Sequence, residues 1–157
     1  LTSAMQDSVN WYFQNLDRQM GLPALASYYS RIGYGNCDLS SGAENYWSNS
    51  LTISPLEQVR LLSGLLSNTW DFASENIRAV KDAMLLSEHS VSGGRLYGKT
   101  GTSNPDGGTQ SGWFVGFLET GETTYCFAVN LQGEGCDGST AADVALQSLT
   151  TMLSRTE

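Results

Sequence analysis

Three strand-like segments follow one another in the second half of the chain, with only short links between them. They cover about residues 94–100, 112–118 and 124–130, and each contains aromatic or β-branched residues. The link from 119 to 123 contains Gly121 and is typical of a hairpin turn. Such short links join antiparallel strands, so this half of the chain is predicted to form an antiparallel meander.

The first half has the periodicity of helices instead. Residues 2–20 repeat apolar side chains at spacings of three and four, which predicts one helix capped by Thr2 or Ser3. Pro55, preceded by Ser54 as a cap, begins another helix. The remaining predicted helices cover 23–31, 55–67, about 73–87 and 139–154, the last with Ser139 near its start. Helices, then an antiparallel sheet, then a C-terminal helix define an α+β fold.

The composition indicates that this fold is incomplete. Charged residues make up 15% of the chain, whereas about 25% is usual for a soluble domain. Part of the surface is therefore expected to meet another part of a larger protein. Three strands and one covering helix also make a thin sheet, and the chain starts abruptly at a helix. We expect residues 1–157 to form one partial domain that pairs with a missing N-terminal segment.

The charge and hydropathy of the chain exclude two kinds of partner. The net charge is -8, and the basic residues form no stripe of the kind that binds phosphates, so nucleic acid is not expected. No run approaches the roughly 18 apolar residues of a membrane span, and no signal peptide is visible. We therefore expect no membrane contact from this segment itself.

The cysteines and the single histidine do not form a metal site. Cys37, Cys126 and Cys136 lack the close spacing of metal ligands, and no metal or organic cofactor is expected. Cys126 lies in an apolar run and is interpreted as a small buried hydrophobe, with a Cys126–Cys136 disulfide as the alternative. His89 lies in a polar turn and is given a surface role.

Lys99-Thr100-Gly101 ends the first strand-like segment and suits recognition of a carboxylate or an acyl group. The lysine supplies charge, the threonine supplies a hydroxyl, and the glycine lets a substrate approach the backbone. Such a site works beside an activated nucleophile. The lysines of the chain are Lys81 and Lys99, and the residues three positions before them are Arg78 and Leu96. The chain therefore contains no Ser-x-x-Lys nucleophile.

Residues 93–100 also satisfy the pattern of a phosphate-binding loop. That loop needs a buried strand before it and a helix immediately after it. Here a polar turn precedes the pattern, and a glycine- and proline-containing stretch follows it. Nucleotide binding is excluded by this context.

Four further motifs have plain structural interpretations when each is taken alone. Ser8-Val9-Asn10 is polar helix surface, Tyr34-Gly35-Asn36 is a turn, Trp47 is a core anchor, and residues 112–116 are a buried strand. Taken together and in this order with Lys99-Thr100-Gly101, they resemble the class D serine β-lactamases and the β-lactam-sensing domains of BlaR-type receptors. The resemblance spans nearly the whole chain and lacks only the Ser-x-x-Lys element. It implies the penicillin-binding-protein-like fold.

The resemblance implies catalytic roles for two residues. Ser8 would pass protons at the acylation site, and Lys99 would hold Ser8 and the substrate electrostatically. Thr100 and Thr102 would bind the substrate carboxylate through their hydroxyl groups. The backbone N–H of Thr102 would form half of an oxyanion hole, whose other half belongs to the absent nucleophile.

The resemblance also implies the rest of the substrate site. Asn10 would point into the cleft beside the absent lysine, and Trp47 would pack near that lysine, which the family often carries as a carbamate. Gly101 belongs to the same substrate-binding strand as its neighbours. Tyr34-Gly35-Asn36 would shape the loop beneath the site.

Two departures from the family pattern favour a sensor over a hydrolase. The hydrolases usually have an apolar valine where this chain has Asn10, and an apolar neighbour helps to keep the carbamate that activates deacylating water. They also often carry a carboxylate-binding arginine on the last helix, and residues 138–143 contain none. The main interpretation is the penicillin-binding sensor domain of a BlaR-type receptor, at the extracytoplasmic face of a bacterial membrane. The alternatives are a class D β-lactamase, which can be secreted, and an inactive fragment or interaction module.

Overall fold

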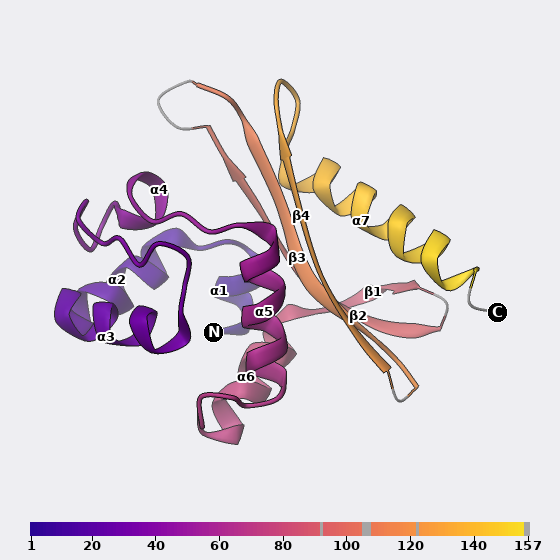
Figure 1. Cartoon of the computed structure of the whole chain (residues 1–157), viewed down its shortest axis with the longest axis horizontal. Helices are drawn as coiled ribbons and strands as arrows, with labels where there is room; N and C mark the ends of the chain where they lie inside the picture. Colours follow the sequence, from indigo (N-terminus) through magenta and orange to yellow (C-terminus); the bar gives the residue numbers. More distant parts are fainter. Residues whose placement is uncertain (92, 105–107, 122, 156–157) are drawn as a thin grey trace. The chain divides into compact units, whose positions relative to one another are not determined.

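The computed structural model describes residues 1–91, 93–104, 108–121 and 123–155; the side chains of 88–90 lie outside this description. The chain divides into two compact units, Leu1–Ala83 and Met84–Glu157. The first unit is helical, and the second contains a sheet with one helix (Figure 1). Each unit is described by itself below.

The second unit is an antiparallel meander of four described strands in the order β1-β2-β3-β4. A C-terminal helix, α7, packs along one face of this sheet (Figure 1). The predicted α+β class, the meander and the C-terminal helix are confirmed. The elements are β1 (Leu85–Val91), β2 (Gly94–Ser103), β3 (Ser111–Thr120), β4 (Thr123–Gln132) and α7 (Gly138–Leu153).

The prediction of three strands and of a helix to residue 87 was wrong. Helix α6 ends at Met84, and the chain continues directly into β1. β1 pairs with β2 through Ser90↔Arg95 and Val91↔Gly94, so sheet pairing replaces the last turn of helix. His89 accordingly lies in a strand rather than in a turn, and its side chain is outside the described part of the chain.

The two faces of the sheet are packed differently. On the α7 face, Leu96 and Leu118 are fully buried and meet Leu149 of the helix. On the opposite face, the ring of Phe117 stacks on Tyr97 with centroids 4.4 Å apart. This alternation follows from the two-residue repeat of a strand, and it places Lys99 on the same face as Tyr97.

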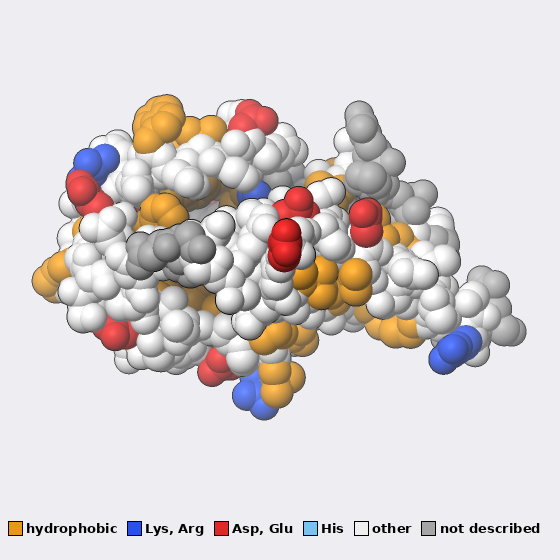
Figure 2. All heavy atoms as spheres, turned by 90° about the horizontal axis from the view of Figure 1, so that it is seen from above, with side chains coloured by type: hydrophobic (Ala, Val, Ile, Leu, Met, Phe, Trp, Pro, Cys, Tyr) orange, Lys and Arg blue, Asp and Glu red, His pale blue; other side chains and the backbone are white. Residues whose placement is uncertain are grey.

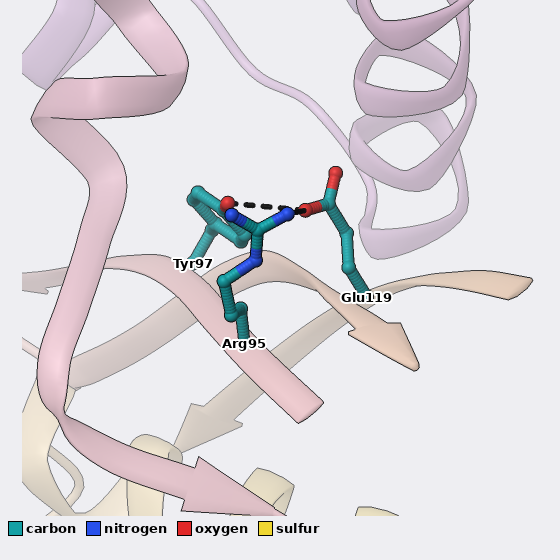
Figure 3. A network of polar contacts seen from close by, with 3 residues as sticks. All are labelled: Arg95, Tyr97 and Glu119. Carbon is teal, nitrogen blue, oxygen red and sulfur yellow. Dashed lines mark hydrogen bonds and ion pairs between the residues drawn. The ribbon is translucent and has the colours of Figure 1, made fainter. Parts of the chain in front are cut away.

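Glu119 of β3 fixes the register of β2 at one end of the sheet. Its Oε2 accepts a hydrogen bond from the Tyr97 hydroxyl at 3.0 Å and lies 3.2 Å from Arg95 Nη2 (Figure 3). Arg95 and Glu119 are direct cross-strand partners. Opposite charges at paired positions stabilise one register over its neighbours.

The first unit consists of helices joined by loops. The predicted helix over 2–20 is in fact two helices, with a break at residues 7–9. The predicted 23–31 and 55–67 helices are confirmed with small shifts of their ends. The elements are α1 (Thr2–Gln6), α2 (Asn10–Met20), α3 (Leu22–Ile32), α4 (Tyr46–Asn49), α5 (Pro55–Leu66) and α6 (Ser74–Met84).

The predicted N-cap of α5 is confirmed, and the predicted N-cap of α1 is wrong. Ser54 caps α5 as predicted, and Glu57 completes a reciprocal capping box. The N-cap of α1 is Leu1, without a side-chain hydrogen bond, so neither Thr2 nor Ser3 caps it. The N-cap of α7 is Asp137, whose carboxylate accepts from the Thr140 N–H at 2.8 Å, and Ser139 lies near the start of the helix as predicted.

Cys37, Cys126 and Cys136 are thiols, so the alternative of a Cys126–Cys136 disulfide is not realised. Cys126 was interpreted as buried and is only partly buried.

On the face drawn in Figure 2, charged side chains lie in small separate groups among uncharged ones. None of the described helices is long and apolar enough to cross a membrane. The described residues contain no cluster of metal ligands.

Candidate functional site

The strand that carries Lys99-Thr100-Gly101 has an open edge at the motif. β3 pairs with β2 from Arg95 to Ser103. On the other side, the pairing of β1 with β2 ends at Leu85↔Tyr97. Within the described part of the second unit, residues 98–103 of β2 therefore have a strand neighbour on one side only. An open strand edge offers backbone donors and acceptors to an extended ligand.

The start of α7 is pressed against this strand. The N–H of Gly138 donates to Thr102 Oγ1 at 2.9 Å. A Cβ on Gly138 would lie 2.8 Å from Thr100 Cβ, and one on Gly112 would lie 2.0 Å from the Asp137 carbonyl oxygen. Glycine is therefore required at both positions for α7 to come this close.

This contact leaves the Thr102 hydroxyl with a defined chemistry. A threonine hydroxyl has one hydrogen to donate and accepts through its lone pairs. Thr102 Oγ1 already accepts from Gly138, so its own hydrogen can be donated to an anion. Thr100 and Thr102 are both exposed, as carboxylate binding by these hydroxyls requires.

Lys99 is half-buried on the face of β2 opposite α7. Its Nζ donates to the Thr100 carbonyl oxygen at 2.8 Å. Burial lowers the pKa of Lys99 from its usual range, because desolvation disfavours the charged ammonium. A lysine with a lowered pKa exchanges its proton more readily near neutral pH than an exposed one.

Ser8 lies in the break between α1 and α2, with a left-handed backbone. Its φ is 51°. The N–H of Ser8 donates to the Met5 carbonyl and that of Val9 to the Ala4 carbonyl, which is the hydrogen-bond pattern of a Schellman turn. Glycine usually occupies this position, and a serine there costs about 1 kcal/mol. Strain held at one polar residue is typical of functional sites.

The break also changes the setting of Asn10. Asn10 is the first residue of α2 rather than a residue of a helix interior. Both Ser8 and Asn10 are exposed. The apolar spacing of the sequence continues through the break, so periodicity alone could not detect it. The only sequence signal for the break was the polar Asp7-Ser8 pair, and such a pair is a weak indicator of a helix end without a glycine.

Trp47 is not the core anchor that its residue type suggests. Its side chain is 42% exposed, whereas that of the preceding Tyr46 is 3% exposed. Both lie on α4, a single helical turn. Tyr46 is thus the anchor, and Trp47 is the side chain that the turn presents outward. Tyr46 was not predicted as an anchor, because the only signal for it in the sequence is an aromatic residue beside a tryptophan in a glycine- and serine-rich loop.

The predicted site residues are therefore distributed over both units. Ser8, Asn10 and Trp47 belong to the first unit, and Lys99, Thr100, Gly101 and Thr102 belong to the second. The structure brings the residues of the second group together on one strand beside the start of α7.

This fold and these motifs define a family. Residues 1–150 match the model of the penicillin binding protein transpeptidase domain, so the chain belongs to that family. The resemblance predicted from the motifs is confirmed. Among curated relatives, the regulatory protein BlaR1 of Bacillus licheniformis is 49% identical over 151 residues, which cover 95% of this chain and 25% of BlaR1. The probable β-lactamase YbxI of Bacillus subtilis is 40% identical over 138 residues, which cover 86% of this chain and 49% of YbxI.

Solved structures agree with the curated relatives. The C-terminal domain of the Bacillus licheniformis BlaR penicillin-receptor superposes with a TM-score of 0.89 and 46% identity, covering 96% of this chain and 61% of that domain. The chain thus spans about a quarter of the length of BlaR1 and less than two thirds of the solved receptor domain.

Proposed function

We propose that this chain is part of a β-lactam-sensing domain of the BlaR type, which binds penicillins by serine acylation. The observation that carries the proposal is the open edge of β2 at Lys99-Thr100-Gly101-Thr102, with the Thr102 hydroxyl oriented by Gly138. The 49% identity to BlaR1 supports a sensor. As part of a receptor, the domain would face the outside of a bacterial membrane.

In the proposed reaction, a serine outside this chain attacks the carbonyl carbon of the β-lactam. The carbon–nitrogen bond of the ring opens, the ring nitrogen takes the proton that the serine hydroxyl gives up, and the acyl group stays on the serine. Ser8 would relay that proton. The Thr102 N–H would stabilise the developing oxyanion, because a preorganised donor favours the charge that appears in the transition state. Thr100, Thr102 and Lys99 would bind the carboxylate of the antibiotic.

The second candidate function is that of a class D β-lactamase, and the 40% identity to YbxI favours it. The two functions differ in the fate of the acyl-enzyme, which persists in a sensor and is hydrolysed in a β-lactamase. Asn10 is the residue that we expect to decide between them. An amide at this position can hydrogen-bond a free lysine amine, which would leave no carbamate to activate water.

Mass spectrometry of the protein expressed from its complete reading frame tests these functions. We expect incubation with benzylpenicillin to add the mass of one penicillin and the adduct to persist, while residues 1–157 by themselves gain no mass. Rapid loss of the adduct with hydrolysis of a chromogenic cephalosporin would establish the hydrolase. Absence of any adduct would leave the inactive or interaction module.

The variant Asn10→Val sharpens the same experiment. We expect it to shorten the lifetime of the acyl-enzyme while acylation still occurs, because the apolar side chain would favour the lysine carbamate. Asn10→Gln keeps an amide and is the matched control. An unchanged acyl-enzyme lifetime in Asn10→Val would contradict the role given to Asn10.

A further inference from the structure

The loop that carries Trp47 is closed at its base by Asn36. The Asn36 N–H donates to the Thr52 carbonyl at 3.0 Å, and Asn36 Oδ1 accepts from the Thr52 N–H at 3.0 Å. Asn36 Nδ2 also donates to the Ser50 carbonyl at 2.8 Å. Gly35 permits this closure, since a Cβ there would lie 1.8 Å from the Thr52 oxygen. The Tyr34-Gly35-Asn36 motif thus joins the two ends of the loop 37–52.

The middle of the same loop is anchored by Tyr46. The Tyr46 hydroxyl donates to Asp17 Oδ2 at 2.9 Å. Because that hydrogen is used, the Tyr46 oxygen accepts from the Tyr29 hydroxyl, 3.0 Å away. The Tyr29 and Tyr46 rings also meet edge to face at 5.6 Å. The result is a directed chain from Tyr29 through Tyr46 to Asp17.

The protonation state of Tyr46 keeps this chain intact. Burial raises the pKa of Tyr46 far above its usual range, and the hydrogen bond that Tyr46 donates to Asp17 acts in the same direction. Tyr46 therefore stays protonated, and remains a donor, well above neutral pH. Connected hydrogen bonds of this kind strengthen one another in a poorly solvated environment.

The anchor joins two segments that sequence analysis placed in the site. Asp17 follows Asn10 by seven positions on α2, which puts both residues on the same face of the helix, about 10 Å apart along its axis. Tyr46 directly precedes Trp47 on α4. The Tyr46–Asp17 bond therefore ties the helix that starts with Asn10 to the turn that presents Trp47.

We propose that Asp17 and Tyr46 are positioning residues of the β-lactam site, which hold Trp47 in place relative to Asn10. This proposal rests on the proposed function. Neither residue would touch the substrate. A single helical turn is not stable without tertiary contacts, so the orientation of Trp47 depends on the anchor beside it.

Fluorine NMR and acylation kinetics of the protein from its complete reading frame test the proposal together. With 5-fluorotryptophan incorporated, the Trp47 resonance is assigned by its loss in Trp47→Phe. We expect Tyr46→Phe, which keeps the ring but loses the hydroxyl, to shift or broaden the Trp47 resonance. The resonance of Trp70, which lies between α5 and α6 and outside the loop 37–52, should stay unchanged. The acylation rate constant for benzylpenicillin should fall about tenfold, because small misplacements in a site are costly. The dissociation constant of the non-covalent complex should stay the same.

Three further variants separate positioning from general stability. Asp17→Asn keeps an oxygen that can accept from Tyr46, so it should retain most of the wild-type rate, whereas Asp17→Ala should behave like Tyr46→Phe. The double variant Tyr46→Phe/Asp17→Ala should be no slower than either single variant, as expected for two partners of one bond. Arg18→Gln is the matched control, because it removes the exposed 3.0 Å pair of Arg18 with Glu44 of the same loop. It should change neither readout.

The outcomes distinguish failure of this proposal from failure of the proposed function. If the wild-type protein forms no adduct, the proposed function is wrong and the positioning role falls with it. If the wild-type protein is acylated but Tyr46→Phe keeps both its Trp47 resonance and its acylation rate, only the positioning role is overturned. Additive losses in the double variant would also overturn it.

Discussion

Each of the two units is stabilised internally by a different kind of contact. In the second unit, the sheet and α7 bury apolar side chains in two clusters, one of Val91, Leu96, Leu118 and Leu149 and one of Phe114, Ala141 and Ala145; Met84, Tyr97 and Phe117 are buried as well. Over a similar length, the first unit buries only Ala4, Leu25, Tyr46, Leu62 and Ala83 among its described residues. Its long loop is closed by polar contacts instead, through Asn36, Tyr46 and Asp17.

This difference shows how each unit holds the predicted site residues that belong to it. Apolar packing between a sheet and a helix fixes a strand along its whole length, so Lys99-Thr100-Gly101 sits on a rigid support. Polar contacts fix a loop at a few points, and losing one of them releases a segment without unfolding the rest. Trp47 should therefore be more sensitive to single hydrogen bonds than Lys99.

The largest effect is expected from Phe117→Ala in the second unit. Phe117 is fully buried and stacked on Tyr97. Its removal leaves a cavity beside Tyr97 on the face of the sheet opposite α7, and the free energy of unfolding should fall by about 3–5 kcal/mol. Urea unfolding followed by circular dichroism measures the loss. Val144→Ala, at an exposed position of α7, is the control and should change the value by no more than about 0.5 kcal/mol. A single hydrogen bond contributes about 1 kcal/mol. A loss below about 1 kcal/mol for Phe117→Ala would therefore contradict the conclusion that apolar packing holds the second unit more firmly than polar contacts hold the first.

A smaller and local effect is expected from Gly35→Ala in the first unit. Its φ is 50°, and a Cβ would collide with the Thr52 carbonyl oxygen. We expect the base of the loop to open, at a cost of about 2–4 kcal/mol in the local free energy that protects the Asn36 and Thr52 amides from hydrogen exchange. Amides of the sheet should keep their protection.

Gly33→Ala separates backbone strain from collision in that experiment. Gly33 also has a positive φ, 65°, but nothing lies within 4 Å of a Cβ there. This variant should cost about 1 kcal/mol. Equal costs for Gly33→Ala and Gly35→Ala would show that the contact with Thr52 does not close the loop.

The smallest effect concerns the pH dependence of a helix cap in the second unit. Hydrogen bonds from Thr140 lower the pKa of Asp137 below its usual value. The stabilisation is therefore present above the pKa of the unfolded state and is lost as the pH falls through the lower pKa of the folded state. Asp137→Asn keeps an acceptor for Thr140 but cannot titrate there. Exchange of the amides in the first turn of α7 should then change less between about pH 5 and pH 2 than in the wild type.

The first unit offers the matched test of that cap. The backbone N–H and the hydroxyl of Ser54 lower the pKa of Glu57 in the capping box of α5, so the same sign holds there. Glu57→Gln should flatten the acid dependence of α5 and leave that of α7 unchanged. A change that spreads to both helices would mean that the two caps are coupled.

The sequence by itself determined the features that depend on local chemistry. The strand-like runs of β2, β3 and β4 with their short links, the Ser54-Pro55 start of α5 and the ordered set of motifs around Lys99-Thr100-Gly101 were sufficient for the α+β class and for the family. Each of these signals lies within a few residues of the chain, where side-chain type and backbone preference act directly.

Only the tertiary structure decided the features that depend on distant partners. β1 exists because residues 85–91 meet β2, and Trp47 is outward because Tyr46 finds Asp17 and Tyr29 on two other helices. At Ser8, backbone hydrogen bonds end the helix, although the apolar spacing of the sequence continues past this point. For β1 and for Trp47, contacts with another segment outweigh the weaker local preference, whereas the break at Ser8 is a local turn that the apolar spacing does not reveal.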